Sequence, residues 1–101
     1  MKKLLLTSAI FLGMTSQAWA NLDLAKKNAC MGCHAVEGKV LGPAFKEVAT
    51  RYSSDKEALS KISATIKKGS VGKWGAVMMP PNEQLTDADT RTLAIWILGL
   101  K

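Results

Sequence analysis

The sequence predicts an all-α protein in one small domain of about four helices. Four stretches carry apolar residues or capping residues in helical patterns, and glycine- or proline-rich segments separate them. No stretch of β-branched residues alternates with polar ones, as a half-buried strand would require. We find no internal repeat and no interdomain linker, which agrees with one domain. The sequence shows no sign of an oligomer, and a monomer is the default expectation.

Two helices are predicted in the N-terminal half of the domain. The first runs from Leu22 to about Gly32, because small or apolar residues recur there at helical spacing. A loop with two glycines and a proline follows at residues 38–43, and a short helix over residues 44–52 comes next.

Two further helices are predicted in the C-terminal half. Ser54 and Glu57 resemble a capping box, and an apolar helical pattern then runs to Gly69. Residues 69–82 break this pattern with glycines and two consecutive prolines, and they form the longest irregular stretch. Thr86 and Asp89 open the last helix, whose apolar stripe consists of Leu93, Trp96, Ile97 and Leu100.

The first twenty residues predict an export signal, which divides the chain into a cleaved leader, residues 1–20, and a domain, residues 21–101. Two lysines precede a mostly apolar stretch, and Ala18-Trp19-Ala20 has the small-x-small pattern of a cleavage site. The alternative is a retained membrane anchor. The apolar stretch is about half of the roughly 20 residues that a spanning helix needs, so we expect Sec-dependent export to the periplasm without stable membrane insertion.

Charge and length narrow the function classes. The formal net charge of +6 is not clustered into the strongly basic profile of a nucleic-acid-binding protein. It suits a mildly basic surface that meets acidic partners, and it suits a merely solvated surface equally well. A domain this short has little chain for a core, and a disulfide between two cysteines three positions apart would constrain little of it.

The most informative motif is Cys30-Met31-Gly32-Cys33-His34, which matches the attachment pattern of c-type haem. On a helix, positions i, i+3 and i+4 share one face, so both thiols can reach the porphyrin while the imidazole of His34 points at the iron. The haem would also supply the apolar surface that so short a chain lacks. We therefore predict one haem c, attached through two thioethers.

Three other interpretations of the cysteine pair were weighed. A zinc site needs four ligands, and residues 21–101 offer two thiols and one imidazole. A thioredoxin-like redox pair needs a βαβ context, which the sequence does not predict. A structural disulfide in a colourless protein is chemically possible after export, but the histidine directly after Cys33 would then be a coincidence.

Elimination narrows the second axial ligand of the iron to two residues. His34 is the only histidine, so methionine is the next candidate for a cytochrome c. Met31 lies between the two cysteines and cannot reach the other face of the haem. Met78 and Met79 remain, directly before Pro80-Pro81, where the fixed φ angles of proline can present a side chain stiffly.

Several motifs together resemble a known family. The haem motif, Gly42-Pro43-Ala44-Phe45, residues 69–82 and residues 93–98 agree in order and spacing with the small bacterial class I cytochromes c of the c-551/c-552 type. This resemblance covers nearly all of residues 22–101. It implies the small class I fold, with about four helices packed around one covalently bound haem.

The resemblance also implies roles for individual residues. The methionine before the proline pair, Met79, would be the ligand, and the Pro43 carbonyl would accept a hydrogen bond from Nδ1 of His34. Asn82 would donate a hydrogen bond to the Met79 sulfur, and the Trp74 indole would donate one to a haem propionate. Each of the three could instead be only a loop, turn or core residue. Thr65 departs from the family, whose members often carry a basic side chain there near a propionate.

The implied activity is electron transfer rather than catalysis. The carrier would accept single electrons from a quinol-side donor such as a cytochrome bc1 complex, and pass them to a nitrite reductase, an oxidase or a peroxidase. Five lysines lie near the haem-contacting segments in the sequence and are candidates for orienting acidic partners: Lys26, Lys27, Lys39, Lys46 and Lys73. The alternative function is a haem enzyme or ligand sensor with a displaceable methionine, which the absence of a second histidine argues against.

The leader can be tested directly. If signal peptidase cuts after Ala20, the exported protein begins at Asn21, and its intact mass equals residues 21–101 plus one haem. Intact-mass spectrometry of periplasmic material measures this. A mass that retains Met1 would contradict the prediction.

Overall fold

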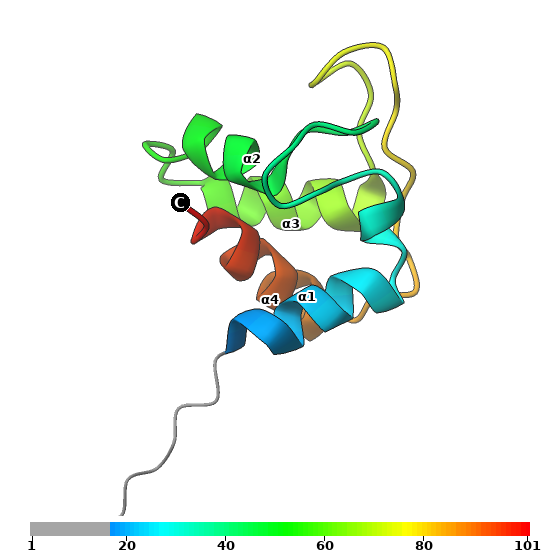
Figure 1. The fold of residues 1–101 in the computed structure, drawn as a ribbon, viewed down its shortest axis with the longest axis vertical. Coiled ribbons are helices and arrows are strands. Elements are labelled where there is room, and N and C mark those ends of the chain that lie inside the picture. Colours follow the sequence, from blue (N-terminus) through cyan, green and yellow to red (C-terminus); the bar gives the residue numbers. More distant parts are fainter. Residues whose placement is uncertain (1–16) are drawn as a thin grey trace, which may run out of the picture.

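The computed structural model describes the backbone from residue 17 to residue 101 and the side chains from residue 21 onward. The predicted leader therefore lies outside the described residues, apart from the backbone of its last four. Figure 1 shows four α-helices and one 3-10 turn: α1 (Gln17–Lys27), η1 (Cys30–Gly32), α2 (Phe45–Arg51), α3 (Ala58–Lys68) and α4 (Asp87–Leu98). The all-α prediction is confirmed.

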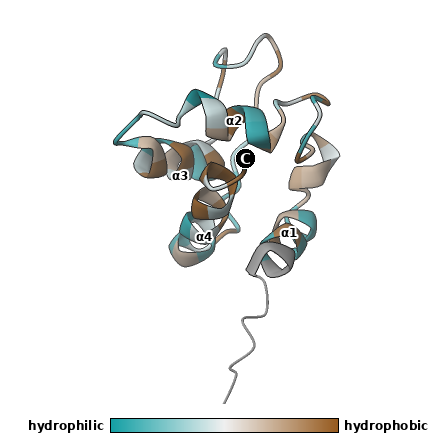
Figure 2. Cartoon of the chain, turned by 60° about the vertical axis from the view of Figure 1, so that its left-hand side comes forward, coloured by the Kyte–Doolittle hydropathy of each residue, from teal (hydrophilic) through white to brown (hydrophobic). Residues whose placement is uncertain are grey.

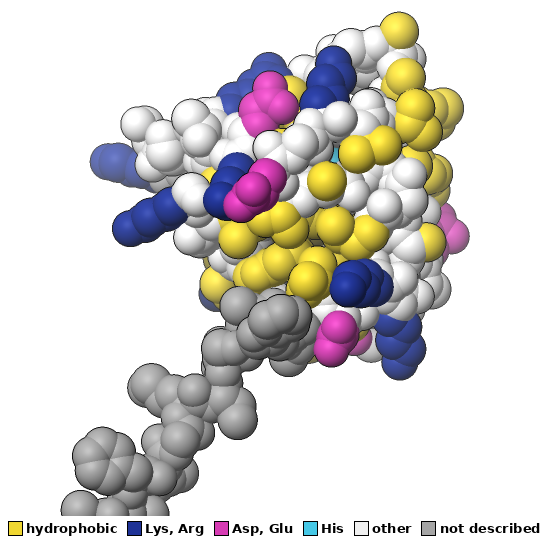
Figure 3. All heavy atoms as spheres, in the orientation of Figure 1, with side chains coloured by type: hydrophobic (Ala, Val, Ile, Leu, Met, Phe, Trp, Pro, Cys, Tyr) yellow, Lys and Arg dark blue, Asp and Glu magenta, His cyan; other side chains and the backbone are white. Residues whose placement is uncertain are grey.

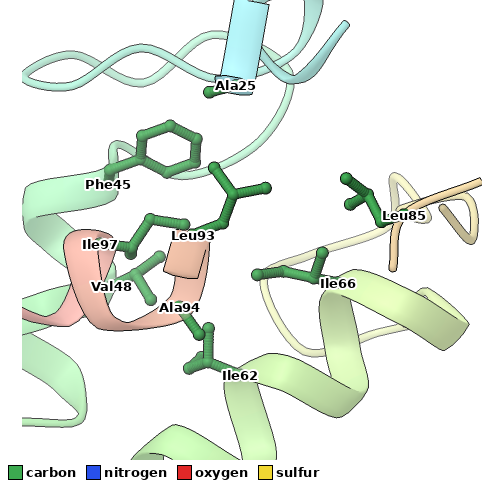
Figure 4. Close-up of a cluster of buried hydrophobic side chains, with 9 residues drawn as sticks. All are labelled: Ala25, Phe45, Val48, Ile62, Ile66, Leu85, Leu93, Ala94 and Ile97. Carbon is green, nitrogen blue, oxygen red and sulfur yellow. The ribbon is translucent and has the colours of Figure 1, made fainter. Parts of the chain in front are cut away.

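Helix α4 is the centre of the fold, because α1, α2 and α3 all pack against it. Each of α2, α3 and α4 carries both hydrophobic and hydrophilic residues along its length (Figure 2). The hydrophobic ones meet in one cluster, in which Leu93 of α4 is only 1% exposed. Figure 4 shows this cluster, which consists of Ala25, Phe45, Val48, Ile62, Ile66, Leu85, Leu93, Ala94 and Ile97.

The first helix both begins and ends earlier in the chain than the sequence pattern indicated, since it starts at Gln17 rather than Leu22. It ends at Lys27, and Ala29 adopts the left-handed conformation with φ 60° before the turn η1 begins. The Leu24 carbonyl accepts the last helical backbone bond, from the Asn28 amide at 3.2 Å, and also the Asn28 Nδ2 at 2.9 Å. The prediction of one continuous helix to about Gly32 was therefore wrong, because the chain turns at Ala29, whose amide donates to the Lys26 carbonyl three residues back.

The predicted capping box at Ser54 is also wrong. Helix α3 begins at Ala58, three residues later than a Ser54 cap would place it. Asp55, not Ser54, makes the side-chain hydrogen bond just before α3, because its Oδ1 accepts from the Glu57 backbone amide at 2.8 Å. Asp55 also pairs with Lys61 at 2.7 Å, and this contact holds the pKa of the Asp55 carboxyl below its usual value.

The last helix begins as predicted. The Thr86 hydroxyl accepts a hydrogen bond from the Asp89 amide at 3.1 Å, which satisfies one free N–H group of the first turn. Leu100 lies beyond the end of α4 but still packs against the core. Within residues 17–101, no helix is both long enough and apolar enough to cross a bilayer.

The irregular stretch between α3 and α4 extends away from the helices, as Figure 1 shows in yellow. Its base is closed by one isolated antiparallel bridge between Ser70 and Met79. The two residues exchange both backbone hydrogen bonds, at 3.0 Å and 2.9 Å. In the part of the chain that the structure describes, this bridge is the only β-type pairing.

Candidate functional site

All seven residues predicted for the site line one cavity between the helices and the two long loops. They come from segments far apart in the sequence, and the fold brings every one of them to the same cavity wall: Cys30, Cys33, His34, Pro43, Trp74, Met79 and Asn82. Met78, the alternative to Met79, lines the cavity too. The residues that the sequence pattern predicted are thus brought together by the fold.

The imidazole of His34 is fixed by its surroundings. Nδ1 lies 2.7 Å from the Pro43 carbonyl oxygen, which can only accept, so Nδ1 carries the proton. This bond leaves the lone pair of Nε2 available to a metal. The ring also stacks on Phe45, with centroids 4.9 Å apart and 24° between the planes.

Gly42 is required by the position of the His34 ring. A Cβ atom at residue 42 would lie 2.5 Å from Cε1 and 2.8 Å from Nδ1 of His34. The Gly42 amide donates to the Cys33 carbonyl at 2.7 Å, so the backbone cannot easily move away. The sequence analysis missed this role, although Gly42 stands directly before Pro43, whose carbonyl was the predicted acceptor of the His34 hydrogen bond.

The two cysteines and His34 lie on one tight turn. The amides of Cys33 and His34 both donate to the Cys30 carbonyl, at 3.2 Å and 2.9 Å. This turn preserves the relation that the helical spacing predicted, even though α1 has already ended. The two cysteines form no disulfide with each other, and burial raises the pKa of the unmodified Cys30 thiol above its ordinary value.

The segment that carries Met79 packs closely against the end of α3. Gly69 follows α3 with φ 77°, and a Cβ atom there would clash with the Met79 carbonyl oxygen and lie 3.0 Å from the Pro81 nitrogen. Only glycine combines this backbone conformation with so close an approach. Met79 is half-buried, whereas the Met78 side chain is 58% exposed.

Asn82 ties the same segment to α3. Its backbone amide donates to the Lys67 carbonyl at 3.1 Å, and its side-chain Nδ2 donates to the Ile66 carbonyl at 3.0 Å. Gln84 donates to the Asn82 Oδ1 at 3.3 Å, which is consistent with the same amide orientation. One of the two Nδ2 hydrogens is thus used by Ile66, and the bond from Asn82 to the Met79 sulfur stays a prediction.

Trp74 lies beneath a cation that the sequence analysis did not single out. The guanidinium carbon of Arg51 is 4.2 Å from the centroid of the Trp74 ring. Lys73, beside it, donates from Nζ to the Thr65 hydroxyl at 3.1 Å. A positive charge therefore does lie at Thr65, supplied by the loop rather than by the helix position itself.

The residues at the cavity suit a covalently bound haem. The wall combines two free thiols, an imidazole nitrogen and a thioether with an apolar lining from the core residues Ile62, Ile66, Leu93 and Ile97. Within the described residues, no group of three His, Cys, Asp or Glu side chains is placed to hold a metal directly. The donor set fits a large flat apolar group that brings its own metal ligands.

The sequence profile of one protein family, Cytochrome c, matches residues 23–101. The chain belongs to the cytochrome c family. This cytochrome carries covalent haem c at its Cys30 and Cys33 motif, and it is of the small monohaem electron-carrier type rather than an enzyme.

Relatives with the same architecture support the family resemblance found in the sequence. The cytochrome is 51% identical to cytochrome c-552 of Nitrosomonas europaea over 83% of this chain and 82% of that protein. It is 41% identical to cytochrome c-551 of Pseudomonas aeruginosa, again over 83% and 82%. The crystal structure of the wild-type Nitrosomonas europaea protein superposes with a TM-score of 0.77, over 79% of this chain and 99% of that one.

The close contact at Gly42 generates a prediction. Gly42→Ala places a methyl group against the imidazole ring and should destabilise the protein by about 1–3 kcal/mol, because overpacking displaces a well-fixed side chain. Denaturant unfolding of the purified protein measures the effect.

Gly38→Ala is the matched control, since a Cβ atom there meets nothing within 4 Å. Its free energy of unfolding should stay within about 0.5 kcal/mol of the wild type. Equal losses in both variants would show that the His34 contact is not the cause.

Proposed function

We propose that this protein is a periplasmic one-electron carrier whose haem iron is ligated by His34 and Met79. The observation that carries the proposal is the His34 imidazole, whose Nδ1 is hydrogen-bonded to the Pro43 carbonyl and which lines the same cavity as the Met79 thioether. When bound, the haem supplies an iron that alternates between the ferric and ferrous states. The role of the chain is to bind it, exclude water and keep both ligands in place.

Met79 is preferred to Met78 because its backbone is fixed. The bridge to Ser70, the close approach of Gly69 and the two following prolines all restrict residue 79. Met78 is more exposed and takes no part in the bridge. A ligand held by its backbone loses little entropy on binding and needs little reorganisation when the charge of the iron changes.

Asn82 and Trp74 support this arrangement in the proposal. Asn82, fixed by Ile66 and Lys67, would offer its remaining Nδ2 hydrogen to the Met79 sulfur. The half-buried Trp74 would donate its indole N–H to a propionate. If both axial positions of the iron are filled by protein side chains, no position remains for a substrate. The competing function is a haem enzyme or ligand sensor, in which the methionine would be displaced from the iron.

Export and partners complete the proposal. The composition of residues 1–20 supports Sec-dependent export, and a periplasmic carrier would link a quinol-side donor to a terminal reductase, oxidase or peroxidase. Lys26, Lys27 and Lys39 are exposed, whereas Lys46 pairs with Glu37 at 2.8 Å and so contributes less to a positive surface. These lysines would orient acidic partners.

Axial ligation can be tested with two adjacent substitutions. Met79→Ala should abolish the weak near-infrared methionine-to-iron band of the ferric protein and lower its reduction potential, because a soft ligand that favours ferrous iron is lost. Met78→Ala, the matched control, should retain the band. A band lost in Met78→Ala and kept in Met79→Ala would reverse the assignment, and a high-spin wild type would favour the sensor.

Steering by the lysines predicts a salt dependence. The bimolecular rate of electron transfer to an acidic redox protein should fall about tenfold between low salt and 0.15 M salt, since the Debye length then shrinks to about 8 Å. Stopped-flow kinetics measure this rate. Lys39→Gln should lower the rate at low salt, and Lys56→Gln, which lies before α3 and lines a separate pocket with residues of α3 and α4, should not. Rates that are flat with salt would remove steering.

A further inference from the structure

The 71–78 loop, which is the part of the irregular stretch beyond the Ser70–Met79 bridge, is weakly attached to the fold. Val71, Val77 and Met78 are all more than half exposed. Figure 3 shows hydrophobic side chains at the upper right, where this loop lies in the same orientation in Figure 1. Gly72 and Gly75 adopt positive φ angles of 74° and 121°, so the loop combines high chain entropy with little burial.

Apart from Trp74, which packs against the hydrophobic core cluster, few contacts oppose opening of this loop. In the described chain, residues 17–101, two hydrogen bonds join residues 71–78 to the rest of the fold, and both involve Lys73. Its Nζ donates to the Thr65 hydroxyl, which is an exposed contact between flexible groups. Its carbonyl oxygen accepts from Nη1 of Arg51 at 2.9 Å.

Arg51 makes two contacts with the loop at once. It is the last residue of α2, and its guanidinium both donates to the Lys73 carbonyl and lies over the Trp74 ring at 4.2 Å. A planar guanidinium can donate in its plane while its face covers an indole, which a lysine ammonium cannot do in the same way. Arg51 forms no ion pair within the described residues, so its charge is directed at the loop.

We propose that Arg51 is a positioning residue for the Met79 ligand. By binding Lys73 and Trp74 it fastens the 71–78 loop to α2, and so keeps the Ser70–Met79 bridge closed and Met79 in the cavity. This inference rests on the proposed ligation of the iron by Met79. According to this inference, the end of α2, a helix that contributes no ligand, controls how readily the iron loses its methionine.

The test uses the haem-loaded protein and imidazole as the probe. Imidazole reaches the iron only when Met79 leaves, so its apparent affinity is proportional to the fraction of open loop. Arg51→Lys keeps the charge at the end of α2 but loses the paired contacts, and should raise the apparent affinity about three- to tenfold. Titration against the near-infrared methionine band measures this affinity.

Arg91→Lys is the matched control, because Arg91 is an exposed arginine on α4 outside the cavity wall. Its imidazole affinity should equal that of the wild type. Amide hydrogen exchange provides the second measurement: in Arg51→Lys the Ser70 and Met79 amides should exchange faster by a similar factor, while the Leu93 and Ile97 amides of α4 stay unchanged.

The outcomes separate the two levels of the proposal. A wild type without the methionine band would overturn the Met79 ligation and this inference with it. A wild type with the band, but with equal imidazole affinity in Arg51→Lys, would overturn the role of Arg51 and leave the proposed function intact. Faster exchange throughout the molecule would mean general destabilisation, which also overturns a positioning role.

Discussion

The fixed imidazole of His34 is the constraint on which the rest of the structure depends. The Pro43 carbonyl sets its proton, Gly42 leaves room for the ring, and Phe45 stacks on its face. Phe45 also makes an edge contact with Trp96 of α4, with ring centroids 5.6 Å apart. Phe45 therefore links the position of the imidazole to the packing of the C-terminal helix.

The hydrophobic core and the haem site are largely the same residues. Of the buried cluster around α4, the members that also line the cavity are Ala25, Phe45, Val48, Ile62, Ile66, Leu93 and Ile97. Each of these side chains packs against other core residues and also faces the cavity that the apolar faces of a haem would fill. A domain of this length cannot bury enough surface alone, so haem attachment and formation of the core are coupled.

The two segments that carry the proposed ligands, His34 and Met79, are stabilised in different ways. His34 follows a turn whose amides converge on one carbonyl, and its ring is enclosed by the core. Met79 lies at the end of an exposed loop, held by one backbone bridge, by Asn82 and by the side chain of Arg51. The histidine segment is therefore the permanent part of the site, and the methionine segment is the part whose opening has an adjustable cost.

The sequence by itself determined the helical class and the family, and it named residues that the fold then brings to one cavity. The reason is that these features are local. The spacing of Cys30, Cys33 and His34 and the proline pair after Met79 each involve only a few neighbouring residues, so their chemistry can be recognised without knowing the rest of the fold. Helix ends were predicted less well. Thr86 capped α4 as expected, but α1 ended before a left-handed turn at Ala29. Asp55 took the place assigned to Ser54, because several polar side chains compete for the same free backbone groups.

Only the tertiary structure decided which distant residues support the ligands. Arg51 and Lys73 are 22 positions apart, and nothing in their neighbourhoods indicates that a guanidinium would lie on Trp74. The roles of Gly42 and Gly69 likewise come from what approaches them, an imidazole in one case and the Met79 carbonyl in the other. Such contacts depend on how whole helices pack, which a local pattern does not encode, whereas the chemistry of a motif is contained in the motif.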